Sequence, residues 1–407
     1  TASELYLNGA TFNDVCTFKN TGSVNVTSTG GCTFAKAMTL TSNGGPSTIY
    51  SLSNTAGDTY NGPAYFENKS GTFSLNNGLF KGKCTFRSNT TTGEGFYVAG
   101  AGNCTFKDSV VITQLLGPGM FFGGGNVVLD SSSNLCFSSG IGGSSYFQKL
   151  TRLGSTPINI LDGPDNLNLG QNNTFQSNFS FTGKSITLYE NVFYGTTTIK
   201  VHGGTTSSSY GGNVFHGATL IQDSSSTAHS MYLAIAAPDD YNDDVTFVQK
   251  GTGVSLYPAY TKNSTFAKNI MIDGTTSMQM GGNGGKVILD GTTAQSITRG
   301  NTALIPTIKK LQINKSSNSI TLNSPLTISD SLILTKGRIN SDTTNFISML
   351  HGSKLSGGSD SSYVNGPMKK VGNSAFVFPL GSSTRSHPYH PLGISAPAAS
   401  TDEFKAI

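Results

Sequence analysis

The chain has 407 residues, of which only 12% are charged and 36% are hydrophobic, with 50 glycines and no Trp. An average globular domain has about 25% charged residues and about 7% Gly. No run of 18 apolar residues is present, so no membrane-spanning helix is expected, and 24 Phe and 15 Tyr argue against a disordered chain. The abundant Thr, Val, Phe, Gly, Asn and Ser favour strands and turns, and we expect an all-β protein.

The formal net charge is +4, spread over few charges. Lys and Arg are scattered, and the densest places are Lys309–Lys310 and Lys369–Lys370. A nucleic-acid surface needs a basic stripe interleaved with aromatic residues. We therefore expect no nucleic-acid partner.

From the N-terminus onwards, a three-residue motif that ends in Phe recurs, first as Cys-Thr-Phe at 16–18 and last as Ser-Thr-Phe at 264–266. Most steps from one Phe to the next are 16 to 22 residues. Repeats of this length built from short strands predict a parallel β-helix in which each anchor Phe stacks on that of the next coil. The predicted core ladder is Phe18, Phe34, Phe66, Phe86, Phe106, Phe137, Phe175, Phe193, Phe215, Phe247 and Phe266.

Apolar residues at alternate positions follow most anchors, for example Ile199 and Val201 after Phe193. A period of two indicates a strand with one buried face. A propeller would repeat every 40 residues or more, roughly, and a β-sandwich would lack a repeated anchor. The fold predicted for residues 1–300 is therefore a β-solenoid with irregular coils of about 16–22 residues.

The five cysteines, Cys16, Cys32, Cys84, Cys104 and Cys136, all lie in the first third of the chain. No Cys-x-x-Cys pair is present, which argues against zinc. In Cys-Thr-Phe the Cys and the Phe share one side of the strand, so Cys16, Cys84 and Cys104 are expected to point inward as small hydrophobic residues. The alternative is a cross-coil disulfide, Cys16 with Cys32 or Cys84 with Cys104, since neighbouring coils lie close together.

The anchor Phe disappears near residue 300, and tighter aliphatic alternation follows, as in Leu332-x-Leu334. We interpret residues 301–362 as further β-helix coils. Residues 363–407 are rich in Pro around FVFPLG and predict the start of a β-sandwich-like element. A domain of that size is marginal alone, so we expect the native sequence to continue.

Candidate chemistry is sparse. The one dense acidic group is Asp239, Asp240, Asp243 and Asp244, which is either a solvated turn or a loop that binds calcium or sugar, since calcium prefers oxygen ligands. Asp162 and Asp165 in LDGPDN form a weaker candidate of the same kind, and His387 and His390 are expected in a loop. No nucleophile elbow or phosphate loop is present. We expect a non-enzyme without a cofactor, apart from the calcium alternative.

Three stretches carry a resemblance: SELYLNGATFNDVCTFKNTG at the N-terminus, KVILDGTTAQSITRG from Lys286 and SYVNGPMKKVGNSAFVFPLG from Ser362. They resemble the large β-strand-repeat surface proteins of Bacteroidota, and the likeness extends over nearly the whole chain. It implies an adhesin-like protein exported by the type IX secretion system. Cys before Phe, where that family usually has Asn, is a departure. The resemblance also implies O-glycosylation at Asp-Ser/Thr-apolar sites, here Ser109, Ser331 and Thr343.

Three functions follow as hypotheses. The first is a non-enzymatic, extracellular structural or adhesive protein, a rigid β-helical segment of a cell-surface adhesin or stalk, with surface glycans or other cell-surface proteins as partners. The second is a subunit that builds a fibre with copies of itself, because uncapped β-helix ends are open edges. The third is a polysaccharide-active enzyme, which would need clustered carboxylates.

Overall fold

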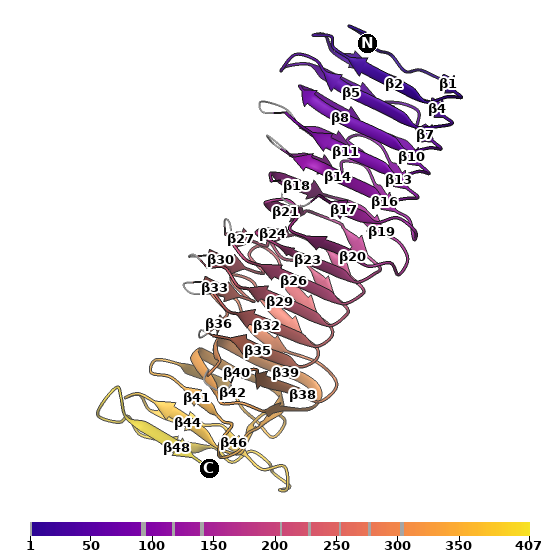
Figure 1. Cartoon of the computed structure of the whole chain (residues 1–407). Helices are drawn as coiled ribbons and strands as arrows, with labels where there is room; N and C mark the ends of the chain where they lie inside the picture. Colours follow the sequence, from indigo (N-terminus) through magenta and orange to yellow (C-terminus); the bar gives the residue numbers. More distant parts are fainter. Residues whose placement is uncertain are drawn as a thin grey trace. The chain divides into compact units, whose positions relative to one another are not determined.

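The structure, a computed structural model, describes residues 2–90, 95–115, 119–138, 142–203, 206–226, 229–251, 254–275, 278–301 and 305–407. All the secondary-structure elements within these residues are β-strands. No helix long and apolar enough to cross a membrane is found among them. The chain forms two compact units, Thr1–Gly204 and Thr205–Ile407. Each unit is a β-solenoid of stacked parallel strands, with about 15 turns in all (Figure 1). The predicted all-β parallel β-helix is confirmed.

Each coil of the N-terminal unit passes along three faces in turn, with one short strand on each. The first face carries β1 (Thr11–Phe12), β4 (Thr33–Phe34), β7 (Asp58–Tyr60), β10 (Gly78–Phe80), β13 (Cys104–Phe106), β16 (Val127–Leu129), β19 (Leu150–Arg152), β22 (Thr174–Phe175) and β25 (Val192–Phe193). The second carries β2 (Cys16–Asn20), β5 (Met38–Asn43), β8 (Ala64–Ser70), β11 (Cys84–Ser88), β14 (Val110–Leu115), β17 (Leu135–Phe137), β20 (Ile158–Leu161), β23 (Phe179–Gly183) and β26 (Thr197–Val201). The third carries β3 (Val26–Thr27), β6 (Ile49–Leu52), β9 (Thr72–Leu75), β12 (Phe96–Val98), β15 (Met120–Phe122), β18 (Ser144–Phe147), β21 (Asn166–Leu169) and β24 (Ser185–Leu188).

The C-terminal unit begins with the same plan. Its first face has β28 (Val214–Phe215), β31 (Asp239–Tyr241), β34 (Ser264–Phe266) and β37 (Val287–Leu289). Its second has β29 (Thr219–Asp223), β32 (Val245–Gln249), β35 (Ile270–Gly274) and β38 (Gln295–Arg299). Its third has β27 (Ser207–Ser208), β30 (His229–Tyr232), β33 (Val254–Tyr257) and β36 (Gln279–Met280).

The later coils of this unit begin with two long strands and continue with short ones. They comprise β39 (Thr307–Leu322), β40 (Leu326–Asn340), β41 (Ile347–Met349), β42 (Lys354–Gly357), β43 (Val364–Asn365), β44 (Met368–Val371), β45 (Phe376–Phe378), β46 (Leu380–Gly381), β47 (Leu392–Ile394) and β48 (Glu403–Ala406). β39 pairs in turn with β36, β37 and β38, so one long strand spans all three faces. The solenoid thus continues across residue 300, and β43 and β44 still pair in parallel with β40 and β41. Within 363–407, β47 and β48 run antiparallel to β45 and β44.

The anchor Phe residues occupy two ladders, which corrects the single ladder predicted from the spacing. On the first face Phe34, Tyr60, Phe80 and Phe106 are in register, and the rings of Phe80 and Phe106 stack 4.6 Å apart. Phe66 and Phe86 stack on the second face. Phe86 and Phe106 are 20 residues apart in sequence, yet their rings meet edge to face at 6.1 Å across the core. The motif thus recurs on two of the three faces.

Coil length follows from the register rather than from the Phe spacing. One coil takes 18 residues from Phe175 to Phe193 and 26 from Phe34 to Tyr60. The first length lies within the predicted range and the second exceeds it. Some Phe-to-Phe steps, such as Phe66 to Phe86, are whole coils, whereas the step from Phe86 to Phe106 crosses from one ladder to the other. Nine of the eleven predicted anchors are buried, and Phe18 and Phe137 are half-buried.

Candidate functional site

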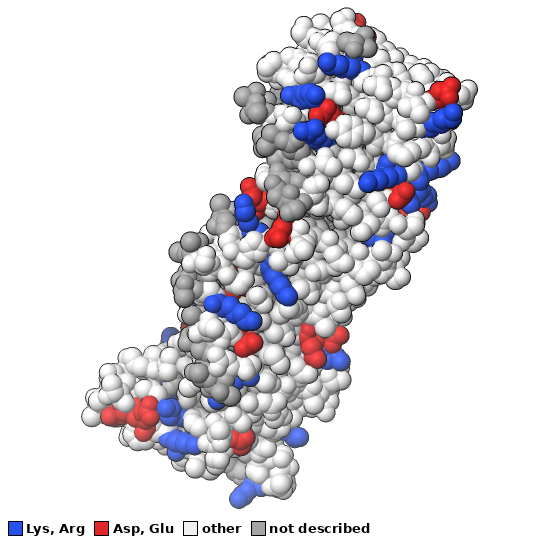
Figure 2. All heavy atoms as spheres, in the orientation of Figure 1, with Lys and Arg blue, Asp and Glu red and all other residues white. Residues whose placement is uncertain are grey.

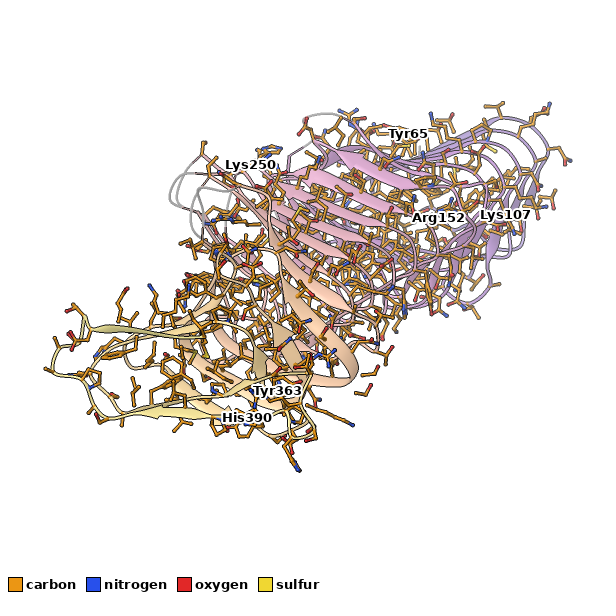
Figure 3. The ribbon with its side chains drawn as sticks, turned by 90° about the horizontal axis from the view of Figure 1, so that it is seen from below. Tyr65, Lys107, Arg152, Lys250, Tyr363 and His390 are labelled. Carbon is orange, nitrogen blue, oxygen red and sulfur yellow. The ribbon has the colours of Figure 1, made fainter. Side chains whose placement is uncertain are left out.

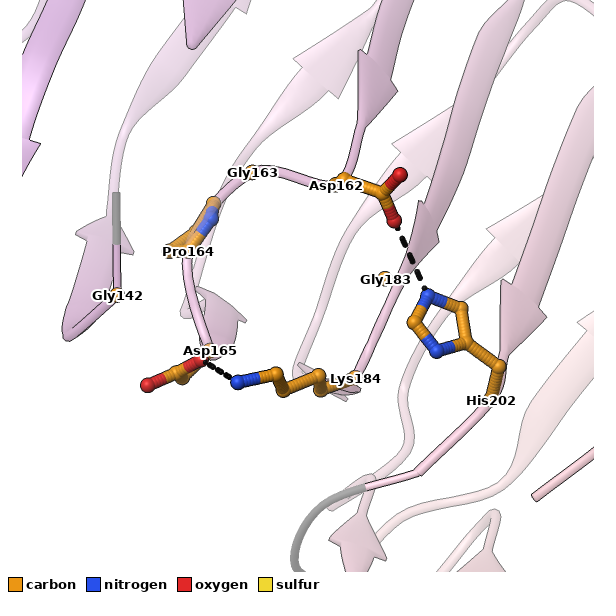
Figure 4. Close-up of a pocket in the computed structure, with 8 residues that line it drawn as sticks. All are labelled: Gly142, Asp162, Gly163, Pro164, Asp165, Gly183, Lys184 and His202. Carbon is orange, nitrogen blue, oxygen red and sulfur yellow. Dashed lines mark hydrogen bonds and ion pairs between the residues drawn. The ribbon is translucent and has the colours of Figure 1, made fainter. Parts of the chain in front are cut away.

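A pocket opens in the N-terminal unit at the corner between its second and third faces. Strand β23 ends at Gly183 and β24 begins at Ser185, so Lys184 alone makes this corner, whereas the preceding coil uses the four residues from Asp162 to Asp165. The short corner leaves a hollow of about 390 Å³ (Figure 4). A Cβ at Gly183 would come within 2.6 Å of the buried Phe181 ring, so this inward position next to the pocket requires glycine. The pocket is lined by Gly142, Asp162, Gly163, Pro164, Asp165, Gly183, Lys184 and His202.

An ion pair and a His–Asp hydrogen bond, formed by residues of three successive coils, face this pocket. His202, directly after β26, places Nε2 3.2 Å from Asp162 Oδ1, and Lys184 Nζ pairs with Asp165 Oδ1 (Figure 4). The side chains are 42% to 57% exposed. The pocket thus has carboxylate oxygens that accept hydrogen bonds beside an ammonium group that donates them. This combination suits the hydroxyl groups of a neutral ligand, because a hydroxyl group both donates and accepts. From the sequence Asp162 and Asp165 are only a weaker candidate in a turn, and their partners Lys184 and His202 come from later coils.

The four predicted acidic residues do not converge on one point. Strand alternation sends Asp239 inward and Asp240 outward on β31, and Asp243 and Asp244 lie in the turn before β32. Asp244 Oδ1 accepts hydrogen bonds from the backbone and side chain of Asn269. In the part of the chain that the structure describes, no three His, Cys, Asp or Glu residues gather to hold a metal ion. The predicted calcium loop is therefore not assembled.

Asp239 belongs instead to a polar ladder inside the first face. It is 1% exposed and accepts hydrogen bonds from the backbone N–H and side-chain amide of Asn213, at 2.9 and 2.8 Å. Burial raises the pKa of Asp239 to about 6, although these hydrogen bonds oppose the shift. Asn173 and Asn191 hold the same position in the N-terminal unit, where Asn173 Nδ2 donates to Asn191 Oδ1 at 2.8 Å.

The cysteines of the motif lie on two different faces of the solenoid. Cys104 precedes Phe106 on the first face and aligns with Gly78 and Val127, whereas Cys84 is on the second face and aligns with Ala64 and Val110. All five cysteines are free thiols. The predicted Cys16–Cys32 and Cys84–Cys104 disulfides are wrong, because each pair is divided between two faces.

The expected burial of the motif cysteines holds for two of the three. Cys84 and Cys104 are buried, and burial raises the pKa of the Cys104 thiol to about 12. Cys16 is half-buried, since it lies in the first coils with Phe18.

Sequence reasoning missed three buried cations. Arg152, labelled in Figure 3, is fully buried in the aromatic ladder between Leu129 and Phe175 and donates to the backbone carbonyls of Asp130, Ser131 and Thr156. Lys315 and Lys370 act in the same way in the C-terminal unit, on turn carbonyls that include Gly291 and Ser353. The available signal was the inward position of Arg152 in Leu150-x-Arg152.

The remaining predicted positions lie at the surface. His387 and His390 lie between β46 and β47, outside the strands, and His387 Nδ1 is 3.7 Å from an Asp360 carboxylate oxygen. Of the positions predicted to carry O-glycans, Thr343 is exposed, and Ser109 and Ser331 are half-buried. Glycosylation stays a prediction.

Comparison with known protein families, with characterised proteins and with solved structures finds no match to this chain.

Proposed function

We propose that the chain is a non-enzymatic, extracellular structural and adhesive protein: a rigid β-helical segment of a surface adhesin or stalk. The observation that carries this proposal is the unbroken register of the strands. On the third face of the N-terminal unit every strand from β3 to β24 pairs in parallel with the next. Such a stack fixes rows of outward side chains in space, which suits weak contacts repeated along a surface.

The nature of the surface supports the same proposal. Figure 2 shows Lys, Arg, Asp and Glu as scattered single residues or small groups on a mostly uncharged face. With only 12% charged residues, the exterior is dominated by Ser, Thr and Asn, whose side chains both donate and accept hydrogen bonds. A partner rich in hydroxyl groups, such as a surface glycan, fits this chemistry better than a charged polymer.

The polysaccharide-active enzyme stays a second candidate because of the pocket at Asp162 and Asp165. A hydrolase needs two carboxylates in the roles of acid and of base or nucleophile. Here Asp165 pairs with the Lys184 ammonium group, and Asp162 contacts the His202 imidazole. The fibre hypothesis rests on the general argument that open strand edges can pair with another copy.

Antibodies against the chain, applied to intact cells that produce it, test the proposal together with electron microscopy of material sheared from those cells. We expect label without permeabilisation and isolated rods. Label that appears only after permeabilisation contradicts an extracellular role, and regular fibres favour the self-assembling subunit. New reducing ends from a polysaccharide incubated with the chain, lost in Asp162→Asn and Asp165→Asn, would establish the enzyme.

A further inference from the structure

One outward row on the third face of the N-terminal unit contains no charged residue. Strand pairing aligns one outward side chain from each of eight successive strands. This outer row consists of Thr27, Ser51, Ser74, Tyr97, Phe121, Tyr146, Asn168 and Thr187. Three successive coils therefore present aromatic rings to the outside, in the middle of a row of hydroxyl and amide side chains.

The three rings differ in arrangement from the rings of the core. Inside the same coils, Phe122 and Phe147 stack at 4.8 Å with an interplanar angle of 15°, so each ring covers the other. Outside, Tyr97 and Phe121 are tilted by 56° at 5.8 Å, and Phe121 and Tyr146 by 37° at 6.4 Å. The outer rings consequently do not cover one another's faces, and Tyr97 is 38% exposed.

A second outward aromatic group shows that this arrangement is particular to the outer row. In the C-terminal unit, Tyr232 and Tyr257 stack at 5.5 Å with an interplanar angle of 11°, and Tyr260 packs against Tyr232 at 4.3 Å. These rings cover each other and fill space over Gly282, where a Cβ would come within 2.2 Å of the Tyr260 ring. They stabilise their own coils and leave little ring surface for a ligand.

The charge of the outer row decides what kind of partner fits. Single-stranded nucleic acid binds aromatic rows that lie in a positively charged groove, and the outer row has no Lys or Arg. A stable protein interface covers about 800 Å² on each side, whereas this aromatic strip is one side chain wide between Ser, Thr and Asn. A neutral sugar chain matches both features, because the C–H face of a pyranose ring packs on the negative face of an aromatic ring and its edges carry hydroxyl groups.

The pocket lies beside the same strands. Asp165 directly precedes β21, which carries Asn168, and Lys184 directly precedes β24, which carries Thr187. Asn166 adds an outward amide next to Asp165 on β21. Hydrogen-bonding side chains thus continue from the aromatic part of the outer row to the ion-paired pocket, without a band of single-sign charge.

We propose that the outer row, with the pocket at its edge, is a binding face for an extended, uncharged glycan. Tyr97, Phe121 and Tyr146 pack against successive sugar rings, and the pocket at Asp165 and Lys184 binds hydroxyl groups of the same chain. This inference rests on the proposed adhesive function and specifies its ligand. It requires no chemical step on the glycan.

The test measures binding of neutral glucan, mannan and xylan oligomers, from di- to hexasaccharides, with oligouronates as the charged comparison. Calorimetry gives affinity, and tyrosine fluorescence reports directly, since the chain has no Trp. We expect neutral oligomers of at least one of these glycans to bind with an affinity that rises with oligomer length. The triple variant Tyr97→Ala, Phe121→Ala, Tyr146→Ala should bind them more than about tenfold more weakly. Asp165→Asn with Lys184→Gln weakens the longer oligomers only.

Two controls separate ring packing from other effects. Tyr65→Ala with Tyr194→Ala removes two other outward tyrosines of the same unit and leaves affinity unchanged. Tyr97→Phe with Tyr146→Phe keeps the rings and retains binding within about threefold. Circular dichroism and the thermal midpoint check that each variant is folded.

The proposal is overturned if no neutral oligomer binds, if only oligouronates bind, or if the folded triple variant binds like the wild type. Equal loss in the Tyr→Phe and Tyr→Ala variants also overturns it, because the hydroxyl groups and not the ring faces would then carry binding. If antibodies label intact cells but no glycan binds, the proposed structural role stands and only the proposal of a glycan-binding face is contradicted.

Discussion

Asp239 is a carboxylate inside the C-terminal solenoid, and its protonation is linked to stability. Burial raises the pKa of Asp239 to about 6, above its ordinary value near 3.8. An acid with a raised pKa in the folded state stabilises the fold fully below its unfolded pKa, and this contribution is lost as the pH rises through about 6. A shift of this size corresponds to about 3 kcal/mol.

We predict that Asp239→Asn removes this pH dependence. Asn fits because Asn213 occupies the equivalent position one coil earlier. Between pH 4 and 7 the wild type should lose about 2 kcal/mol more free energy of unfolding than the variant, measured by urea unfolding at each pH. Asp244→Asn, at an exposed carboxylate, should follow the wild type. Parallel profiles for the wild type and Asp239→Asn would contradict the prediction.

Arg152 shows how a charge is accommodated in an aromatic ladder. Its guanidinium group donates to backbone carbonyls at the end of β16 and in the turns that follow β16 and β19: those of Leu129, Asp130, Ser131, Leu153 and Thr156. These hydrogen-bond acceptors are neutral carbonyls; burial lowers the pKa of Arg152, and the nearby Asp130 carboxylate opposes this shift. Buried acceptors that lose their donor cost about 1–3 kcal/mol each.

Arg152→Leu should therefore lower the free energy of unfolding by about 2 kcal/mol or more, even though Leu fits between Leu129 and Phe175. Lys107→Met is the matched control, because Lys107 pairs with the Asp130 side chain of the same turn and is 49% exposed. Its effect should stay below about 1 kcal/mol. Chemical denaturation measures both. An Arg152→Leu variant as stable as the wild type would show that water replaces the guanidinium group.

At the scale of the element, side-chain contacts along the ladders, including many ring contacts, hold the short strands together. Phe266 on β34 is 1% exposed, stacks on Tyr241 at 4.9 Å and meets Phe247 edge to face at 6.1 Å. A strand of three residues has few hydrogen bonds of its own, so side-chain packing between coils supplies most of its stability.

Phe266→Ala is expected to cost about 3–5 kcal/mol, since it leaves a cavity next to Tyr241 and Phe247. Met271→Ala on the neighbouring β35 removes an outward side chain that is 41% exposed and should change stability by less than about 0.5 kcal/mol. Urea unfolding of both variants provides the comparison. Similar losses in the two would mean that the ladder does not hold the coils.

The strands themselves were predictable, because inward Phe, Val, Ile and Leu alternate with Thr and Ser along almost every one. Their assignment to faces was not. Cys84-Thr-Phe86 and Cys104-Thr-Phe106 are identical in sequence but lie on different faces, and only the turn lengths between them determine this. The disulfide prediction failed for the same reason.

The pocket depends on features that periodicity does not contain. It exists because a single residue, Lys184, makes one corner while the coil before uses Asp162 to Asp165. The residues that face each other are up to 40 positions apart, as with Asp162 and His202. The outer row was likewise hidden, since Tyr97, Phe121 and Tyr146 become neighbours only once the register is known.

At the scale of the whole molecule, stability is divided among many contacts between adjacent coils. A solenoid coil touches only its neighbours, so damage to one ladder stays local. Charge contributes little to these contacts: among the described residues, most ion pairs are exposed, such as Lys36–Asp14 at 59% and 87%, and Arg152 and Lys370 bind neutral groups. Exposed pairs are typically worth about 0–1 kcal/mol and weaken with salt.

Sodium chloride should therefore hardly affect the fold. Between low salt and 0.5 M, roughly a fourfold or larger reduction of the Debye length, we expect the thermal midpoint to move by less than about 4 °C, because hydrogen bonds to backbone carbonyls and packed rings are not screened. Sodium sulfate at equal ionic strength should raise it, since sulfate strengthens apolar burial. A midpoint that falls steeply with sodium chloride would mean that the scattered charges in Figure 2 act as a network across coils, and the neutral ladders would no longer account for the stability of the solenoid.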